Sequence, residues 1–150
     1  MHNAIISDAS CLILLDKIGE LELLNKLYGT IITTEEVAME FGNPLPSWLE
    51  IKAVNKNYQS IIEASLDKGE ASAIALAIEY EECLLIIDDL KGRKFAHQLG
   101  VAIIGTLGII LDAKLAGIIP SANQLLIKIK QTNFRLTERL ELWILNRAGE

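Results

Sequence analysis

Apolar residues along the chain gather in two kinds of segment. Short runs rich in Ile, Leu, Val and Thr predict strands, whereas longer segments with apolar residues three or four positions apart predict helices. The predicted strands lie at 3–7, 30–33, 51–54, 84–87 and 101–104, with 51–54 at a sheet edge and the last two buried. The predicted helices lie at 9–18, 20–28, 34–41, 59–66, 67–82, 90–99, 107–116, 121–131 and 137–147. Because strands and helices alternate, the sequence predicts a central parallel sheet flanked by helices, a three-layer α/β fold.

The length and composition predict a single domain with a large core. The chain has 150 residues, of which 51% are hydrophobic, and this length suffices for one proper core but not for two. No apolar run is long enough to cross a bilayer, and the first residues lack the basic region of a signal peptide. Cys11 and Cys83 both lie in apolar segments, which favours reduced, buried thiols. We therefore expect a cytoplasmic protein with no membrane partner.

Charge is distributed unevenly along the chain. The net charge of −6 argues, taken alone, against a nucleic-acid partner. However, residues 1–90 hold 5 Lys and Arg against 16 Asp and Glu, a net −11, whereas residues 91–150 hold 9 against 4, a net +5. An acidic centre beside a basic half suits a metal-dependent enzyme that acts on a polyanion. A chance asymmetry of the surface is the alternative.

Asp8 stands where the first predicted strand ends and an apolar helix begins. In open α/β sheets the ligand crevice lies outside the carboxyl ends of the strands, so this position favours a role in a functional site. Asp is also a common helix N-cap, and Asp8 therefore has a purely structural interpretation as well.

Glu70 lies on the buried side of its predicted helix. It precedes Ile74 by four residues, which places its carboxylate in line with the apolar stripe of helix 67–82. A helix that packs back along a parallel sheet begins near the carboxyl ends of the strands, so Glu70 is expected at the same edge as Asp8. The structural alternative is that Asp67-x-x-Glu70 forms a capping box.

Glu40 is the unusual acid of helix 34–41. It follows Val37 by three residues and so lies on the inner side of the helix, about 9 Å from its start. Glu35 and Glu36 are better placed for solvent and for the helix dipole. Of these three acids, the sequence singles out Glu40 as the candidate for the site.

Asp88 and Asp89 end the most apolar predicted strand. Adjacent carboxylates repel each other, and a cation that holds one of them relieves this repulsion. The alternative is that one of them caps the helix beginning at Leu90 while the other is exposed. The sequence predicts a site role for one of the pair and leaves open which one.

These positions together predict a carboxylate cluster at one edge of the sheet, formed by Asp8, Glu40, Glu70 and Asp88. Ligand sets made only of oxygen suit Mg²⁺ or Mn²⁺ and do not suit Zn²⁺. The two histidines lack ligand spacing to a cysteine. The sequence also contains no phosphate-binding loop, dinucleotide-binding glycine motif or nucleophile elbow.

The order and spacing of these motifs resemble the PIN-domain family, in particular an uncharacterised PIN-like branch related to prokaryotic toxin/antitoxin ribonucleases. The similar segments cover nearly the whole chain and lie at 5–10, 35–40, 69–77, 85–93 and 105–108. The resemblance implies cleavage of RNA phosphodiester bonds with Mg²⁺ or Mn²⁺ as cofactor, and an antitoxin protein as a partner.

The resemblance also assigns residues. The acidic quartet of the family is matched by Asp8, Glu40, Glu70 and Asp88. The fourth acid of the quartet could equally be the neighbouring Asp89, because the two aspartates are adjacent in the sequence. Ser10 matches a hydroxyl residue that supports a metal ligand or water, while Ala9 departs from the family pattern, in which this position is often Thr.

Two other functions remain as alternatives. A catalytically inert nucleic-acid or protein binding module would keep the fold without turnover, and it would not degrade RNA when Mg²⁺ or Mn²⁺ is present. A phosphorylation receiver also gathers acids at strand ends, but it needs a Lys at the end of the last strand, where this chain has Gly105-Thr106.

Two surface expectations complete the analysis. Basic residues on the predicted helix after Asp88-Asp89 indicate where RNA phosphates bind: Lys91, Arg93 and Lys94. The alternative for Arg93 is an ion pair with Asp89, four residues earlier. Helix 20–28 has more leucines than a short helix needs to cover one face, which predicts a homodimer; these are Leu21, Leu23, Leu24 and Leu27.

Overall fold

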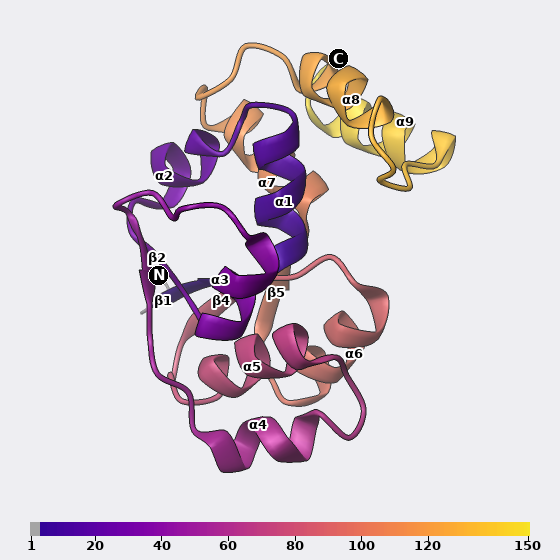
Figure 1. The fold of residues 1–150 in the computed structure, drawn as a ribbon. Coiled ribbons are helices and arrows are strands. Elements are labelled where there is room, and N and C mark those ends of the chain that lie inside the picture. Colours follow the sequence, from indigo (N-terminus) through magenta and orange to yellow (C-terminus); the bar gives the residue numbers. More distant parts are fainter. Residues whose placement is uncertain (1–3) are drawn as a thin grey trace.

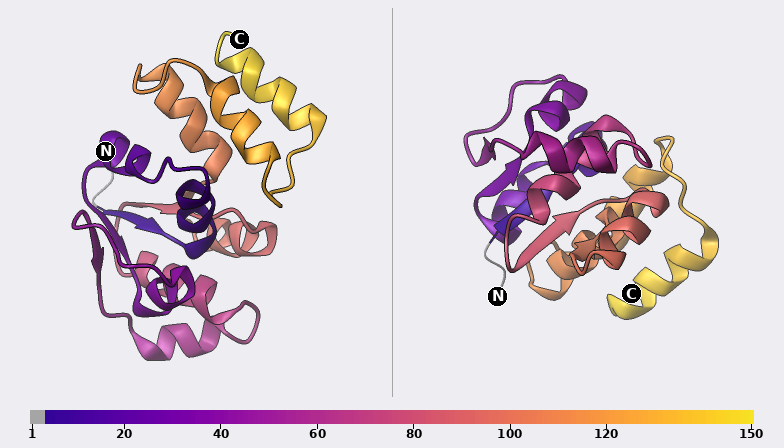
Figure 2. Two further views of the ribbon diagram at one scale, coloured as in Figure 1. Left: turned by 45° about the horizontal axis from the view of Figure 1, so that its top comes forward. Right: turned by 90° about the horizontal axis from the view of Figure 1, so that it is seen from below.

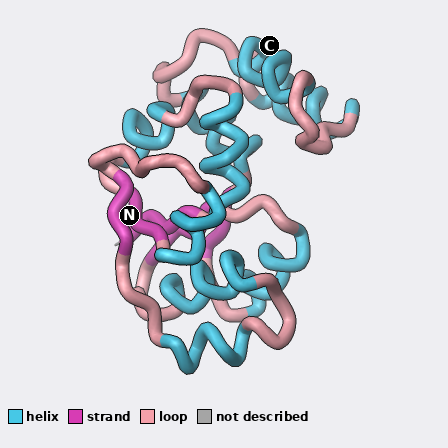
Figure 3. Tube along the Cα trace, viewed as in Figure 1, coloured by secondary structure: helices cyan, strands magenta, loops and turns pink. Residues whose placement is uncertain are grey.

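The computed structural model describes residues 4–150, and its centre is a five-stranded sheet (Figure 1). The strands are β1 Ala4–Ser7, β2 Ile31–Thr33, β3 Leu49–Ile51, β4 Cys83–Ile86 and β5 Ala102–Ile104. Their order is β3-β2-β1-β4-β5, and all pairs are parallel. The helices surround this sheet (Figure 3), which confirms the predicted three-layer α/β fold. Asn3, the first residue of the predicted first strand, lies outside the described residues.

The helices cover both faces of the sheet. They are α1 Ala9–Lys17, α2 Glu22–Tyr28, α3 Glu35–Phe41, α4 Lys56–Ile62, α5 Lys68–Ala77, α6 Leu90–Gln98, α7 Thr106–Leu115, α8 Ala122–Lys130 and α9 Glu138–Arg147. In Figure 1, α1, α2 and α7 lie above the sheet and α4, α5 and α6 lie below it. Figure 2 shows that α8 and α9 form a hairpin at one end of the molecule, next to α7.

Helix α5 packs against β1 and β4 in the core. The side chains of Ile6 on β1 and Leu85 on β4 are fully buried. Nearly every residue of α5 is buried too, because this helix lies between the sheet, α3 and α4. The alanines of α5 have small side chains, which let neighbouring elements approach from several sides. This packing fixes the start of α5 next to the carboxyl ends of the strands.

Two predicted boundaries in the middle of the chain are wrong. β3 runs over Leu49–Ile51 instead of 51–54, because the side chain buried in the core is that of Leu49, whereas Ile51 is 50% exposed. α4 begins at Lys56 instead of residue 59. The Asn55 side chain accepts hydrogen bonds from two backbone N–H groups of the first turn and so starts the helix earlier.

Two further predictions need correction around β4 and β5. α5 ends at Ala77, five residues before the predicted end, since the chain turns there to enter β4. β5 is an edge strand, and Ala102 is exposed, so the prediction of a second fully buried strand is wrong. The other helices and strands begin and end within two residues of their predicted positions.

Several smaller expectations are also settled by the fold. Cys11 and Cys83 are free and buried, as predicted. Leu23 and Leu24 are buried in the chain's own core and their neighbouring leucines pack against it, so the leucines of α2 no longer support a dimer. Within residues 4–150, every helix is too short or too polar to cross a membrane.

Candidate active site

A pocket of about 350 Å³ lies at the carboxyl ends of β1 and β4. Six carboxylates and one hydroxyl line this carboxylate pocket: Asp8, Ser10, Glu40, Asp67, Glu70, Asp88 and Asp89. They come from the end of β1, from α1, from α3, from the start of α5 and from the turn between β4 and α6. The structure thus brings together all the acids that the sequence singled out for the site, together with Ser10, and it adds Asp67.

Asp8 is the most buried of these acids, with 3% of its surface exposed. Its backbone N–H donates to the carbonyl of Ile86 at 2.9 Å, which ties the end of β1 to β4. Asp8 occupies the N-cap position of α1, but its side chain makes no capping hydrogen bond. Asp8 therefore stands at the cap position, but its carboxylate does not do the work of a cap.

The carboxylate of Asp8 is poorly satisfied by its surroundings. Its Oδ1 atom is buried without a hydrogen-bond partner, and so is the hydroxyl oxygen of Ser10. Burial, and then the nearby carboxylates, raise the pKa of Asp8 to about 7. Buried polar atoms without a protein partner are rare in folded proteins, so these two oxygens are available to a cation or a water.

Glu70 stands in the first turn of α5. The carboxylate of Asp67 accepts a hydrogen bond from the backbone N–H of Glu70 at 2.9 Å, so Asp67 is the helix cap. The side chain of Glu70 instead lines the carboxylate pocket. Burial, and then the charges of neighbouring acids, raise the pKa of Glu70 to about 8. The Asp67 side of the predicted capping box is therefore present, whereas the Glu70 side chain lines the pocket instead of completing the box.

Glu40 reaches the pocket from the last turn of α3 by lying against Gly69. A Cβ atom at Gly69 would stand 2.8 Å from Glu40 Oε1 and 3.8 Å from Asp67 Oδ1. The absence of a side chain at Gly69 therefore lets α3 and α5 approach closely enough to place two carboxylates in one pocket. Burial, and then the charge of Asp67, raise the pKa of Glu40.

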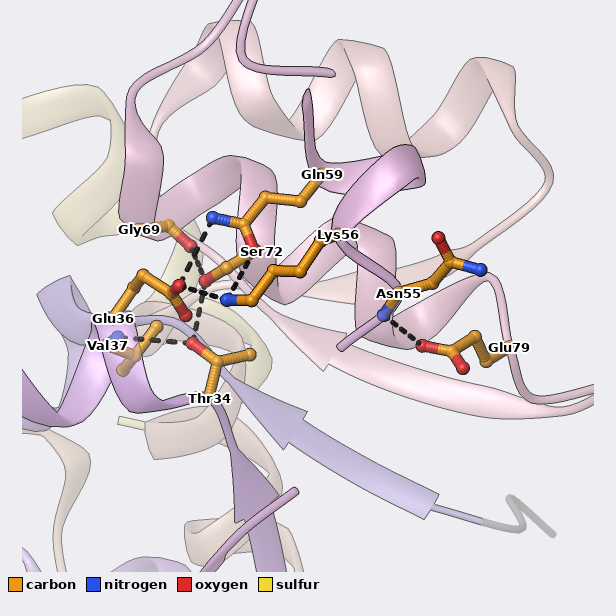
Figure 4. Close-up of polar contacts among 9 residues, drawn as sticks. All are labelled: Thr34, Glu36, Val37, Asn55, Lys56, Gln59, Gly69, Ser72 and Glu79. Carbon is orange, nitrogen blue, oxygen red and sulfur yellow. Dashed lines mark hydrogen bonds and ion pairs between the residues drawn. The ribbon is translucent and has the colours of Figure 1, made fainter. Parts of the chain in front are cut away.

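A hydroxyl pair holds α3 against α5 (Figure 4). The Thr34 side chain caps α3 by accepting from the N–H of Val37, and its oxygen lies 2.6 Å from the Ser72 hydroxyl. The Ser72 hydroxyl also donates to the carbonyl of Gly69 at 2.7 Å. These bonds join the start of α3 to the first turns of α5, so they fix the two elements that carry Glu40 and Glu70.

Glu36 does not face solvent as expected. Its side chain is half-buried and accepts from Lys56 Nζ at 2.7 Å and from Gln59 Nε2 at 3.3 Å (Figure 4). The Lys56 contact and other hydrogen bonds outweigh burial and lower the pKa of Glu36. Glu36 therefore joins α3 to α4 and takes no part in the carboxylate pocket.

The structure separates the roles of Asp88 and Asp89. Asp88 accepts from the Thr106 backbone N–H at 2.7 Å and from the Thr106 hydroxyl at 2.5 Å. Asp89 is exposed and caps α6 by accepting from the N–H of Gly92 at 3.0 Å. The capping alternative therefore applies to Asp89, whereas Asp88 lines the pocket and has both of its oxygens bonded to Thr106. Thr106 was not singled out by the sequence, since only the fold brings it beside Asp88.

The basic residues of α6 differ in what they contact. Lys91 and Lys94 are exposed. Arg93 is half-buried, and its Nη1 atom donates to the carbonyl of Ile87 at 3.0 Å. The alternative ion pair between Arg93 and Asp89 is not found in the part of the chain that the structure describes.

The donor set of the pocket fits a hard divalent cation. All side-chain ligands that line it are oxygens, and an unpartnered carboxylate oxygen of Asp8 is available to a cation. Among residues 4–150, no three His, Cys, Asp or Glu side chains stand where they could jointly hold an ion. Mg²⁺ does not require such a cage, because it keeps several water ligands and binds through one or two carboxylates. Asp8, which has an unpartnered oxygen, and Asp88, whose carboxylate is fixed by Thr106, are the candidates for this role.

The fold and the pocket define an α/β protein with an acidic site at the carboxyl ends of a parallel sheet. A family model described as a PIN domain matches residues 4–150. The chain therefore belongs to the PIN-domain family, whose members are generally nucleases. No curated protein and no solved structure matches the chain.

Proposed function

We propose that this chain is a Mg²⁺- or Mn²⁺-dependent endoribonuclease. The observation that carries the proposal is the carboxylate pocket itself, in which Asp8 is buried with an unpartnered oxygen among five other carboxylates. Such a pocket repels a phosphodiester unless cations neutralise it. A divalent ion held there would lower the pKa of a bound water and neutralise charge on the phosphate.

The residues of the pocket have distinct tasks in this proposal. Asp8 and Asp88 would hold the cation, because the backbone bond to Ile86 fixes the position of Asp8 and Thr106 fixes the carboxylate of Asp88. The raised pKa of Glu70 retains a proton on its carboxyl group near neutral pH before an ion binds. Ser10 has a free hydroxyl to orient water.

RNA is proposed to approach over α6. Lys91 and Lys94 are exposed on this helix, which begins directly after the pocket acids Asp88 and Asp89. Phosphates on either side of the cleaved bond would meet these lysines while the cleaved phosphate lies at the pocket. This arrangement uses the only half of the chain that carries excess positive charge.

A cleavage assay tests the proposal directly. We expect the purified chain to cut single-stranded RNA in Mg²⁺ or Mn²⁺ and to stop in EDTA. Asp8→Asn should remove at least the greater part of this activity, whereas Asp112→Asn, a change at an exposed acid of α7 outside the pocket, should leave it intact. Cleavage that persists in EDTA or in Asp8→Asn would contradict the proposal.

An inert binding module is the second candidate. It is favoured by the finding that no three metal-ligating side chains within residues 4–150 are arranged to hold an ion together. Such a module would bind RNA or a protein and leave RNA at full length with or without Mg²⁺. The same cleavage assay therefore separates the two functions.

We further propose that the chain acts as the toxin of a toxin/antitoxin pair. This proposal is supported by the resemblance of its motifs to that branch of PIN-like sequences. Expression in a bacterial host without the antitoxin should arrest growth, and Asp8→Asn should relieve the arrest. Equal growth inhibition by both forms would show that the effect does not depend on the carboxylate pocket.

A further inference from the structure

A second cavity, which we call the side groove, adjoins the carboxylate pocket. It has a volume of about 550 Å³ and lies between α6, the turn from β5 to α7, and α9. Asp88 lines both cavities. A Cβ atom at Gly105 would stand 2.8 Å from Asp88 Oδ1 and 2.8 Å from Arg93 Nη1. The two cavities therefore share Asp88, and on the groove side Gly105 leaves room for this carboxylate and for the Arg93 guanidinium group.

The walls of the side groove are largely apolar and partly open to solvent. Leu90 on α6 is 66% exposed and Trp143 on α9 is 49% exposed. Phe134, in the loop between α8 and α9, also lines a smaller cavity together with Ser10 and Glu40. The loop thus lines two cavities that each share residues with the carboxylate pocket. Apolar groups grouped around a concave surface in this way mark a binding site.

The charge of the side groove is opposite to that of the pocket beside it. Asp88 is the one acid among its lining residues, whereas Arg93 and Arg135 both line it. The guanidinium carbon of Arg147 lies 4.5 Å from the centroid of the Trp143 ring and adds a further positive charge nearby. In a chain with a net charge of −6, these features favour a ligand that combines a flat apolar part with a negative charge.

An RNA nucleotide has both of these parts. Bases stack on aromatic side chains with little dependence on sequence, while arginines bind the adjacent phosphates. The volume of the side groove also falls within the range of roughly 300–1,000 Å³ that is usual for small-ligand sites. Because the groove joins the carboxylate pocket at Asp88, a base within it would belong to a nucleotide next to the cleaved phosphate.

We propose that the side groove binds an unpaired base of the RNA strand whose phosphate lies at the carboxylate pocket. This inference rests on the proposed function and deepens it, since it assigns a subsite to the base next to the cleaved phosphate. A base within a duplex is paired and stacked, and it would have to leave its helix to enter the groove. Double-stranded RNA is therefore bound less tightly.

The test measures binding without cleavage. A short fluorescent single-stranded RNA is titrated in Mg²⁺ with the Asp8→Asn chain, and its anisotropy gives the Kd. Adding Trp143→Ala should weaken binding about 5- to 150-fold, the range expected for one stacked base. Trp143→Phe keeps an aromatic ring and should restore most of the affinity. Leu142→Ala alters a 62% exposed side chain of α9 outside the groove and serves as the matched control.

A second probe links the effect to the base itself. When the strand carries abasic sites in place of its bases, Trp143→Ala should no longer change the Kd. The proposal is overturned if Trp143→Ala leaves the Kd for the normal strand unchanged. It is also overturned if Trp143→Ala weakens binding of the abasic strand as much as binding of the normal strand, or if duplex RNA binds as tightly as single-stranded RNA. If Trp143→Ala changes the sedimentation coefficient but not RNA binding, the groove is a contact between copies of the chain.

The outcome is distinguishable from a failure of the proposed function. If the unmodified chain does not cleave RNA in Mg²⁺ or Mn²⁺ but Trp143 still controls binding of the normal strand, the nuclease proposal fails and the base site stands. If cleavage is present and the Trp143 variants bind alike, the base site fails alone. Melting temperatures of Trp143→Ala and Trp143→Phe show whether either change unfolds the chain.

Discussion

Replacing Asp8 by Asn should make the metal-free protein more stable at pH 8 than the wild type. Burial, and then neighbouring carboxylates, raise the pKa of Asp8 from its ordinary value of 3.8 to about 7. Between these values the folded state binds more protons than the unfolded state, so the free energy of unfolding falls as pH rises. The raised pKa of Glu70 acts in the same direction.

The size of the effect follows from the pKa of Asp8. Between pH 5 and about pH 7, the Asp8 carboxyl keeps its proton in the folded state and has lost it in the unfolded state. One pKa unit corresponds to about 1.4 kcal/mol, so the Asp8 carboxyl costs the wild type about 3 kcal/mol between pH 5 and pH 8. Asn has a similar shape and does not ionise. For a chain of this length, the Tm of Asp8→Asn minus the Tm of the wild type should therefore be roughly 6 to 12 °C larger at pH 8 than at pH 5.

Thermal unfolding in EDTA at pH 5 and pH 8 measures this difference, with Asp112→Asn as the control for loss of an exposed acid. Saturating Mg²⁺ should then reduce the advantage of Asp8→Asn at pH 8, because an ion that binds only the folded wild type stabilises it by mass action. The reasoning is refuted if the Tm difference between Asp8→Asn and wild type is the same at both pH values. A rise in Tm with Mg²⁺ that is unaffected by Asp8→Asn would show that Asp8 is not a metal ligand.

Three further predictions concern RNA binding, the pocket and assembly. Replacing Lys91 and Lys94 by Ala should flatten the dependence of log affinity for RNA on log salt by about 0.7 per lost phosphate contact, measured by anisotropy at several salt concentrations; an unchanged slope would show that RNA does not lie over α6. Gly69→Ala should lower the cleavage rate with little change in Tm, because a Cβ atom there would stand 2.8 Å from the movable carboxylate of Glu40; retained activity would mean that Glu40 need not approach α5. The homodimer stays a prediction, and sedimentation at tens of micromolar protein that returns only monomer would count against it.

The architecture was predictable because the apolar runs and helical spacings in the sequence favour the same elements that tertiary packing requires. The run that ends at Asp8 and the run that ends at Asp88 are both apolar enough to be central parallel strands, and they pair with each other in the sheet. Boundaries were less predictable where a tertiary contact decides them. The burial of Leu49 sets the position of β3, and the turn after Ala77 ends a helix whose sequence would allow it to continue.

The membership of the carboxylate pocket was predictable in part. Strand ends and helix starts meet at one edge of a parallel sheet, so Asp8, Glu70 and Asp88 were expected together. The roles of Asp67 and Thr106 could not be obtained in this way. Asp67 has the spacing of a helix cap, which it is, and nothing in that spacing shows that its carboxylate also faces the pocket. Thr106 is eighteen residues from Asp88, and only the pairing of β4 with β5 brings the two together.

Glycines explain how so many carboxylates reach one small pocket. A Cβ atom at Gly69 would stand 2.8 Å from a Glu40 oxygen, and one at Gly105 would stand 2.8 Å from an Asp88 oxygen. Neither glycine has a positive φ angle, so the backbone conformation at both positions is open to any residue. What they provide is space: each lies at or near the start of a helix, where the backbone itself forms part of the wall against which an acid packs.

Carboxylates brought together in this way repel one another, which costs stability until cations neutralise them. The raised pKa values of Asp8 and Glu70 and the close approach of carboxylates to Gly69 and Gly105 are therefore two consequences of one arrangement, and a pocket built to hold a divalent cation accounts for both.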